Sequence, residues 1–118
     1  MIVGQSRRVV VGVRSADSGA FVDPATFAFT IRAHDAATTY PPTRYEWSAS
    51  SGVWTPTSDA FGVPSRTGTG SFAIVVTIPY ANAAAGRWVI GWQTTSNALG
   101  EGGGVGEHEL HASTSGAI

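Results

Sequence analysis

The chain has 118 residues, a formal net charge of −1, and neither cysteine nor lysine. This length predicts a single domain over residues 1–118 with a core of its own, and the near-neutral charge argues against nucleic acid or a membrane as a partner. The missing cysteine excludes disulfides and cysteine zinc sites, and the missing lysine excludes Schiff-base chemistry and the lysine of a phosphate-binding loop.

The apolar composition favours strands over helices. Valine and isoleucine together number 18, against 2 leucines, and β-branched side chains suit a pleated sheet. The apolar run at 9–13 has only five residues. A secretory signal needs about 7–15 apolar residues and a spanning helix about 20. We therefore expect the protein to stay in the cytoplasm where it is made.

The first two strands are predicted from contrasting patterns. Apolar residues are nearly continuous over 6–14, and turn-forming residues follow at 15–19. The segment 25–34 alternates instead, with Phe27, Phe29 and Ile31 on one face. That period of two indicates a strand with one buried face.

The middle of the chain predicts a hairpin and then a long loop. The short strands 43–48 and 53–55 are joined by the turn residues 50–52. Residues 56–69 contain prolines, glycines, serines and threonines without a clear period, so an irregular segment is expected there.

Three more strands are predicted in the last third of the chain, over 70–78, 87–94 and about 107–112. The glycine-rich residues 100–106 are expected to form a flexible hairpin connection, because no helix follows that could complete a phosphate site. A small polar tail is expected over 113–118.

Seven short strands without a long helix predict an all-β chain, a single antiparallel immunoglobulin-like β-sandwich of about seven strands. A small β-barrel has the same local signals and is the alternative. The predicted interior consists of the apolar faces of the three strongest strands: Phe27, Phe29, Ile31, Phe72, Ile74, Val76, Trp88, Ile90 and Trp92. Trp47 and Trp54 suit either the core or an interface.

The order of motifs resembles a known family. Phe21-Val22-Asp23-Pro24, Tyr45-Glu46-Trp47, the segments 67–72 and 85–92, and the closing Glu107-His108-Glu109-Leu110 are similar to small immunoglobulin-like, macroglobulin-type domains from the structural genes of tailed bacteriophages. The resemblance implies a virion protein made in the host cytoplasm. It implies several copies per particle, bound to major capsid, portal, neck or tail proteins as a capsid decoration or head-tail connector. A carbohydrate-binding or adhesin-type module is the alternative with the same fold.

No residue pattern predicts an enzyme, a cofactor or a metal site. Glu107, Glu109 and His111 would share one side of a strand, but they lack the spacing with which a helix aligns two histidine ligands. His34-Asp35 at a strand end and the scattered serines lack the surroundings of a hydrolytic triad. We expect a solvent-facing last strand and no catalytic residues.

The partner-binding residues are expected in the segments that are too poor in large apolar groups to pack themselves. These segments are residues 1–5, the loop 56–68, and the glycine-rich connection 100–106 together with the tail 113–118. Trp54, Phe61, Val63 and Arg66 are the predicted contact residues, with Phe61 as the apolar anchor because it is the only ring in its loop.

Overall fold

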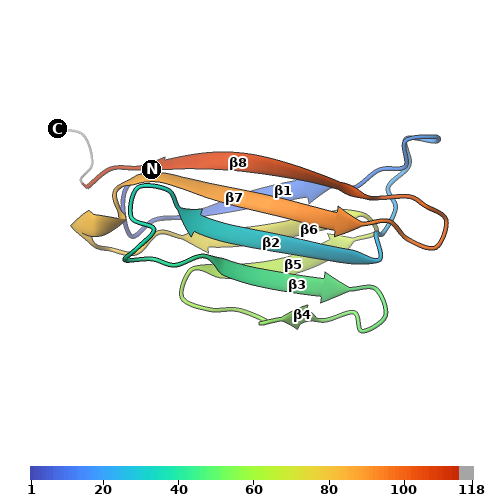
Figure 1. Cartoon of the computed structure of the whole chain (residues 1–118), viewed down its shortest axis with the longest axis horizontal. Helices are drawn as coiled ribbons and strands as arrows, with labels where there is room; N and C mark the ends of the chain where they lie inside the picture. Colours follow the sequence, from blue (N-terminus) through green and yellow to red (C-terminus); the bar gives the residue numbers. More distant parts are fainter. Residues whose placement is uncertain (115–118) are drawn as a thin grey trace.

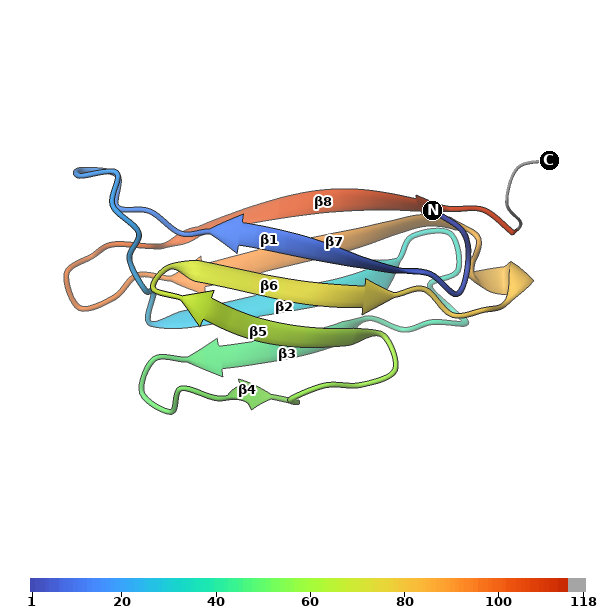
Figure 2. The same ribbon diagram turned by 180° about the vertical axis from the view of Figure 1, so that it is seen from behind.

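A computed structural model describes residues 1–114 as two antiparallel sheets packed face to face (Figure 1). The smaller sheet has the order β1-β6-β5 and the larger sheet the order β4-β3-β2-β7-β8. Figure 2 shows the smaller sheet in front of the larger one. The strands are β1 (Ser6–Gly12), β2 (Thr26–Ala33), β3 (Thr43–Ser48), β4 (Trp54–Thr55), β5 (Gly62–Gly68), β6 (Ser71–Thr77), β7 (Gly86–Thr95) and β8 (Gly104–Ala112), with a 3-10 helix η1 (Asn82–Ala84) before β7.

The chain passes between the two sheets in the order of an immunoglobulin variable-type domain. β1, β6 and β5 take the places of strands B, E and D, and the five-stranded sheet that of C″, C′, C, F and G. The predicted immunoglobulin-like sandwich is confirmed, with eight strands among the described residues. The alternative barrel does not form, because these strands pair into two separate sheets.

None of the named strands corresponds to strand A of an immunoglobulin domain, and residues 1–3 occupy its place beside the end of β8. Ile2 forms a parallel bridge with Ser113, the Val3 amide donates to Ser113 O at 2.9 Å, and the Ser113 amide donates to Met1 O at 3.0 Å. Val3 is 4% exposed. The prediction that residues 1–5 do not pack is therefore wrong, because Val3 contributes to the core. Of the predicted tail 113–118, residues 115–118 lie outside the described part of the chain.

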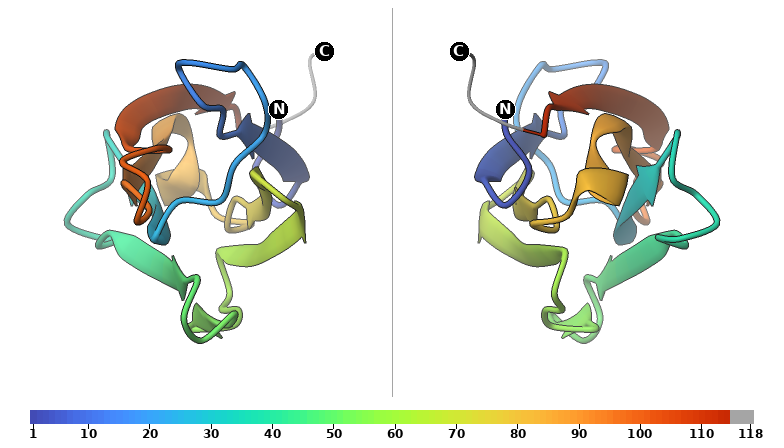
Figure 3. Two further views of the ribbon diagram at one scale, coloured as in Figure 1. Left: turned by 90° about the vertical axis from the view of Figure 1, so that its right-hand side faces the viewer. Right: turned by 90° about the vertical axis from the view of Figure 1, so that its left-hand side faces the viewer.

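The core forms between the inward faces of the two sheets. Phe27 of β2 stacks on Phe72 of β6 with ring centroids 4.2 Å apart, and Trp47 is buried beside them. The predicted core residues are buried except for Trp92, which is half-buried. The end views in Figure 3 show the two layers on either side of this interior.

The prediction of an irregular segment over 56–69 is wrong, because residues 62–68 form β5 and pair with β6. Gly62 packs against the core, where an added Cβ would lie 2.9 Å from Ile31 Cδ1 and 3.0 Å from the Tyr45 hydroxyl oxygen. Pro64 has no backbone N–H to donate to a neighbouring strand, which suits its place on an edge strand. Because the inward positions of β5 include a glycine and a proline, its sequence lacks the alternation of large apolar and polar residues that predicts a strand.

The connection between β6 and β7 is fixed by a ring on β7. The Trp88 Nε1–H donates to Ala84 O at 2.8 Å, and both residues are buried. Immunoglobulin folds often use a tyrosine at this corner, with its hydroxyl bonded a few residues upstream. Here the indole N–H has that role, and it secures η1 against the end of the sandwich.

Candidate functional site

The structure places Trp54 against the core. Its ring stacks on Phe29 with centroids 5.8 Å apart and meets Phe27 and Phe72 edge-on. Its Nε1 is buried without a hydrogen-bond partner among the described residues. Of the two tryptophans of the β3–β4 hairpin, Trp47 is a core residue and Trp54 covers the core at the short edge strand.

Phe61 also packs inward. Its ring lies 6.1 Å from the Tyr40 ring and 6.3 Å from the Trp88 ring, measured between centroids, and it is half-buried. The segment before it is held by Asp59 Oδ1, which accepts hydrogen bonds from the amides of Phe61 and Gly62 and from the Tyr45 hydroxyl. Burial and this acceptor raise the pKa of Tyr45. Phe61 therefore contacts other rings of the same chain.

Arg66 forms part of a polar cluster at one end of the sandwich. Its guanidinium donates to both carboxylate oxygens of Asp23, at 3.1 and 2.6 Å, and the Gly70 amide donates to Asp23 Oδ1 at 2.8 Å. The hydrogen bonds from Arg66 hold the pKa of Asp23 below its ordinary value, although partial burial opposes them. Asn97 Nδ2 donates to the Asp23 carbonyl oxygen at 3.0 Å. The cluster joins β5, the β5–β6 turn and the loops 13–25 and 96–103.

Val63 is the one predicted contact residue on an open face. It alternates with the inward-facing Gly62 and Pro64 and points out of the three-stranded sheet, where it is 52% exposed. Across the sheet it pairs with Val75 of β6, which is 37% exposed. Val10 of β1 is 55% exposed and pairs with Ala73 of β6.

We call Val10, Val63 and Val75, with the buried Ala73 between them, the valine face. It extends towards Phe21, whose ring lies over Gly12 at the end of β1, 3.0 Å from the position of an added Cβ. Phe21 is 47% exposed, and the Arg14 guanidinium lies 4.0 Å from the centre of its ring. The composition of residues 56–68 led to the prediction that the contact residues lie in a loop. The continuous apolar runs of β1 and β6 are the sequence feature that indicates this face.

The outer face of the five-stranded sheet has a different character. Its arginines are paired with glutamates: Arg32 with Glu107 at 3.4 Å, Arg44 with Glu46 at 2.6 Å, and Arg87 with Glu109 at 3.2 Å. All six side chains are at least one-third exposed, so each pair contributes little to stability. His111 lies 3.4 Å from Glu109. No cluster of three or more potential metal ligands occurs within residues 1–114.

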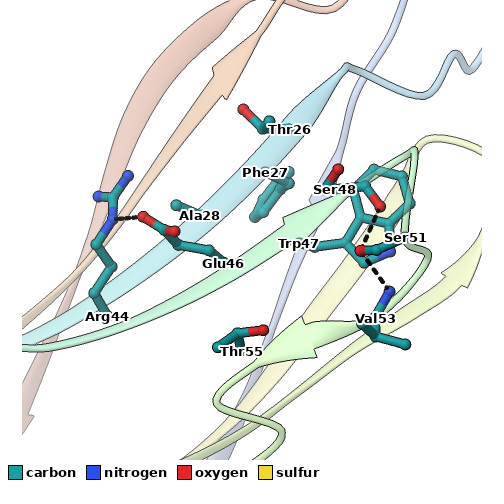
Figure 4. A pocket seen from close by; sticks show the side chains of 10 residues that line it. All are labelled: Thr26, Phe27, Ala28, Arg44, Glu46, Trp47, Ser48, Ser51, Val53 and Thr55. Carbon is teal, nitrogen blue, oxygen red and sulfur yellow. Dashed lines mark hydrogen bonds and ion pairs between the residues drawn. The ribbon is translucent and has the colours of Figure 1, made fainter.

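The hollows in the surface are shallow. Figure 4 shows one on the outer face of the five-stranded sheet, bounded by the Arg44–Glu46 pair and by Ser48, Ser51 and Val53. Its volume is about 230 Å³, below the range of about 300–1,000 Å³ typical of small-molecule sites. Two other hollows, one lined by residues of β2, β3, β7 and β8 and one beside Asp23 and Asn97, measure about 440 and 390 Å³ and are open to solvent. Asp35, half of the His34-Asp35 pair, accepts the Arg87 amide at 2.7 Å and so positions the start of β7.

No protein-family model, curated protein or solved structure matches this chain. No helix among residues 1–114 is long and apolar enough to cross a membrane.

Proposed function

We propose that this chain is a non-enzymatic structural subunit of a tailed-bacteriophage particle that binds other virion proteins, as a capsid decoration or a head-tail neck component. The observation that carries the binding role is the valine face, where three β-branched side chains between 37% and 55% exposed lie on neighbouring strands. Contiguous apolar surface of this kind is typical of protein–protein contacts.

The polar groups of the described residues give less support to chemistry on a small substrate. Asp23 is bonded to Arg66, Asp59 to Tyr45 and two amides, and Asp35 to an amide. These carboxylates hold the backbone in place. A general base or nucleophile needs a free polar group directed into a cavity.

A carbohydrate-binding role has weaker support than protein binding. Sugars are commonly held by stacking on an aromatic ring that lies open on a face. The outer face of the five-stranded sheet carries no phenylalanine, tyrosine or tryptophan at its described positions. Phe21 near the other face is 47% exposed, but Arg14 already stacks on one side of its ring.

The assignment to a virion rests on the resemblance of the sequence motifs to immunoglobulin-like domains of phage structural genes. A rigid sandwich that presents an apolar face is suited to bridge or cap larger subunits, because both sheets keep the face in a fixed position.

Gradient-purified particles from the phage or prophage that encodes the chain would test this function. Mass spectrometry should find the chain in the particles in multiple copies, and a reconstruction should place it on the head, neck or tail. Absence of the chain from intact particles that form normally would overturn the proposal. Specific binding to glycans by the purified protein would then support the alternative.

A further inference from the structure

Apolar residues occupy both faces of β1 and β6, as they also do at Trp88-Val89-Ile90 in β7. Val9-Val10-Val11 of β1 and Phe72-Ala73-Ile74-Val75-Val76 of β6 are continuous apolar runs, whereas β2 and β3 alternate. Continuous runs are typical of strands that are covered on both sides. The core covers the inner sides of β1 and β6, but their outer sides form the valine face and are open in the isolated chain.

The charges beside the valine face have one sign. Arg8 of β1 and Arg14, which follows β1 and bridges to Phe21, share the outward parity of Val10. Arg8 lies opposite Val75 at one side of the face, and Arg14 lies over the Phe21 ring at its other end. Neither forms an ion pair with a described residue, and the outer positions of β1, β5 and β6 carry no aspartate or glutamate. The five-stranded sheet pairs each outward arginine with a glutamate. On the outer side of the smaller sheet, Arg8 and the neighbouring Arg14 therefore have no described carboxylate as a partner, whereas the inward Arg66 is paired with Asp23.

This charge argues against a second copy of the chain as the occupant. Two valine faces packed together would bring arginines from both copies into one interface without a carboxylate to receive them. Covering an arginine without a partner is costly, because the charge loses its water and gains no counter-charge.

We propose that the valine face binds a different protein, whose contact surface has an apolar centre flanked by carboxylates that pair with Arg8 and Arg14. The inference rests on the proposed binding function and names its site and partner chemistry. The two arginines are six positions apart in the sequence, so the partner carboxylates should lie about 20 Å apart, given a rise of about 3.3 Å per residue of extended chain.

The contact must extend beyond the valine face. Even the whole outer side of the three strands, which are about 4.8 Å apart and about 20 Å long, covers an area on the order of 300 Å², whereas a stable interface buries about 800 Å² on each partner. The neighbouring Phe21 continues the face at one end and supplies the nearest further apolar area.

Site-specific photo-crosslinking tests the assignment. The crosslinking amino acid p-benzoylphenylalanine would replace Val63 or Val75, in cells that produce the chain together with its natural gene neighbours. The matched controls are Val105, which is 78% exposed on the five-stranded sheet, and Val53, which is 56% exposed in the β3–β4 turn. Thermal unfolding of each purified variant would show that the fold is kept.

The expected result is a crosslink from positions 63 and 75, but not from 105 or 53, to a protein segment that contains apolar residues and Asp or Glu. Arg8→Glu should lower the crosslink yield at least about tenfold, and the control Arg44→Glu should not. Changing the partner carboxylate to arginine should restore the yield with Arg8→Glu.

Three results would overturn the inference: crosslinks between two copies of this chain, crosslinks to lipid, or equal yields from the valine face and the control positions. If the chain is found in particles but shows any of these, the virion function stands and this site is wrong. If the chain is absent from particles but gives the expected crosslink, the binding site stands and the virion function is wrong.

Discussion

Asp23 is the residue at which one carboxylate holds several segments together. It accepts two hydrogen bonds from Arg66 and one from the Gly70 amide. Because the pKa of Asp23 is lowered in the folded protein, protonation costs more in the folded state than in the unfolded state. The stabilisation is therefore present above the ordinary pKa of about 3.9, and it is lost as the pH falls through the lowered value.

Asp23→Asn should destabilise the protein by about 1–3 kcal/mol at neutral pH, the cost typical of losing hydrogen bonds to a charged group. The difference from the wild type should shrink as the pH falls below about 4. Urea unfolding at a series of pH values measures both effects. Asp17→Asn is the control, because the Asp17 side chain makes no ion pair with any residue of the described range 1–114. A constant difference between Asp23→Asn and the wild type at all pH values would contradict this prediction.

Gly106 and Gly104 of β8 form a matched pair of glycines. A Cβ at Gly106 would overlap the Trp92 indole, whereas a Cβ at Gly104 would meet nothing within 4 Å. We expect Gly106→Ala to displace the ring and to cost about 1–3 kcal/mol, as overpacking does. Gly104→Ala should change the stability by less than about 0.5 kcal/mol. Denaturant unfolding followed by tryptophan fluorescence compares the two variants, and equal stabilities would show that Trp92 does not need the glycine.

Among the elements, β5 depends on the short segment that brings the chain across from β4. Asp59 Oδ1 accepts hydrogen bonds from the Phe61 and Gly62 amides and from Tyr45, which lies on β3 in the opposite sheet. Asp59→Ala should cost about 1–3 kcal/mol and should increase hydrogen exchange at Phe61 and Gly62 more than in β2. Ser58→Ala, at an exposed neighbouring position, is the control. Unchanged exchange at both amides would show that β5 is held by its pairing with β6 alone.

The sequence predicts the elements whose pattern repeats. The alternation of Phe27, Phe29 and Ile31 in β2 and the runs in β1 and β6 predict strands that the structure contains. β5 could not be predicted in this way, because its inward positions do not carry large apolar side chains. Gly62 packs inward without a side chain, and Arg66 lies inward over the Trp47 ring and forms an ion pair with Asp23. In the sequence, a glycine and an arginine at these positions are typical of a loop, and only their contacts with distant residues identify them as inward positions of a strand.

At the scale of the whole molecule, the candidate site depends on which face remains open, and strand pairing over long sequence separations decides this. Val10 and Val63 are more than fifty residues apart, and β6 brings them to one face. The sequence prediction placed Phe61 and Arg66 in a loop and Trp54 on the short hairpin beside it, and the packing of Phe61 and Trp54 against other rings is not visible in the sequence. Val63 was predicted as a contact, and its open position is consistent with the proposal.

The parallel bridge between Ile2 and Ser113 has a mechanical consequence. Residues 1–3 and the end of β8 run in the same direction, so tension applied at Met1 and at Ser113 pulls the two segments past one another along their length. The hydrogen bonds between Met1, Val3, His111 and Ser113 lie across that direction and are loaded together. A pulling force between Met1 and Ser113 therefore shears the hydrogen bonds between residues 1–3 and the end of β8 together, and does not break them one after another.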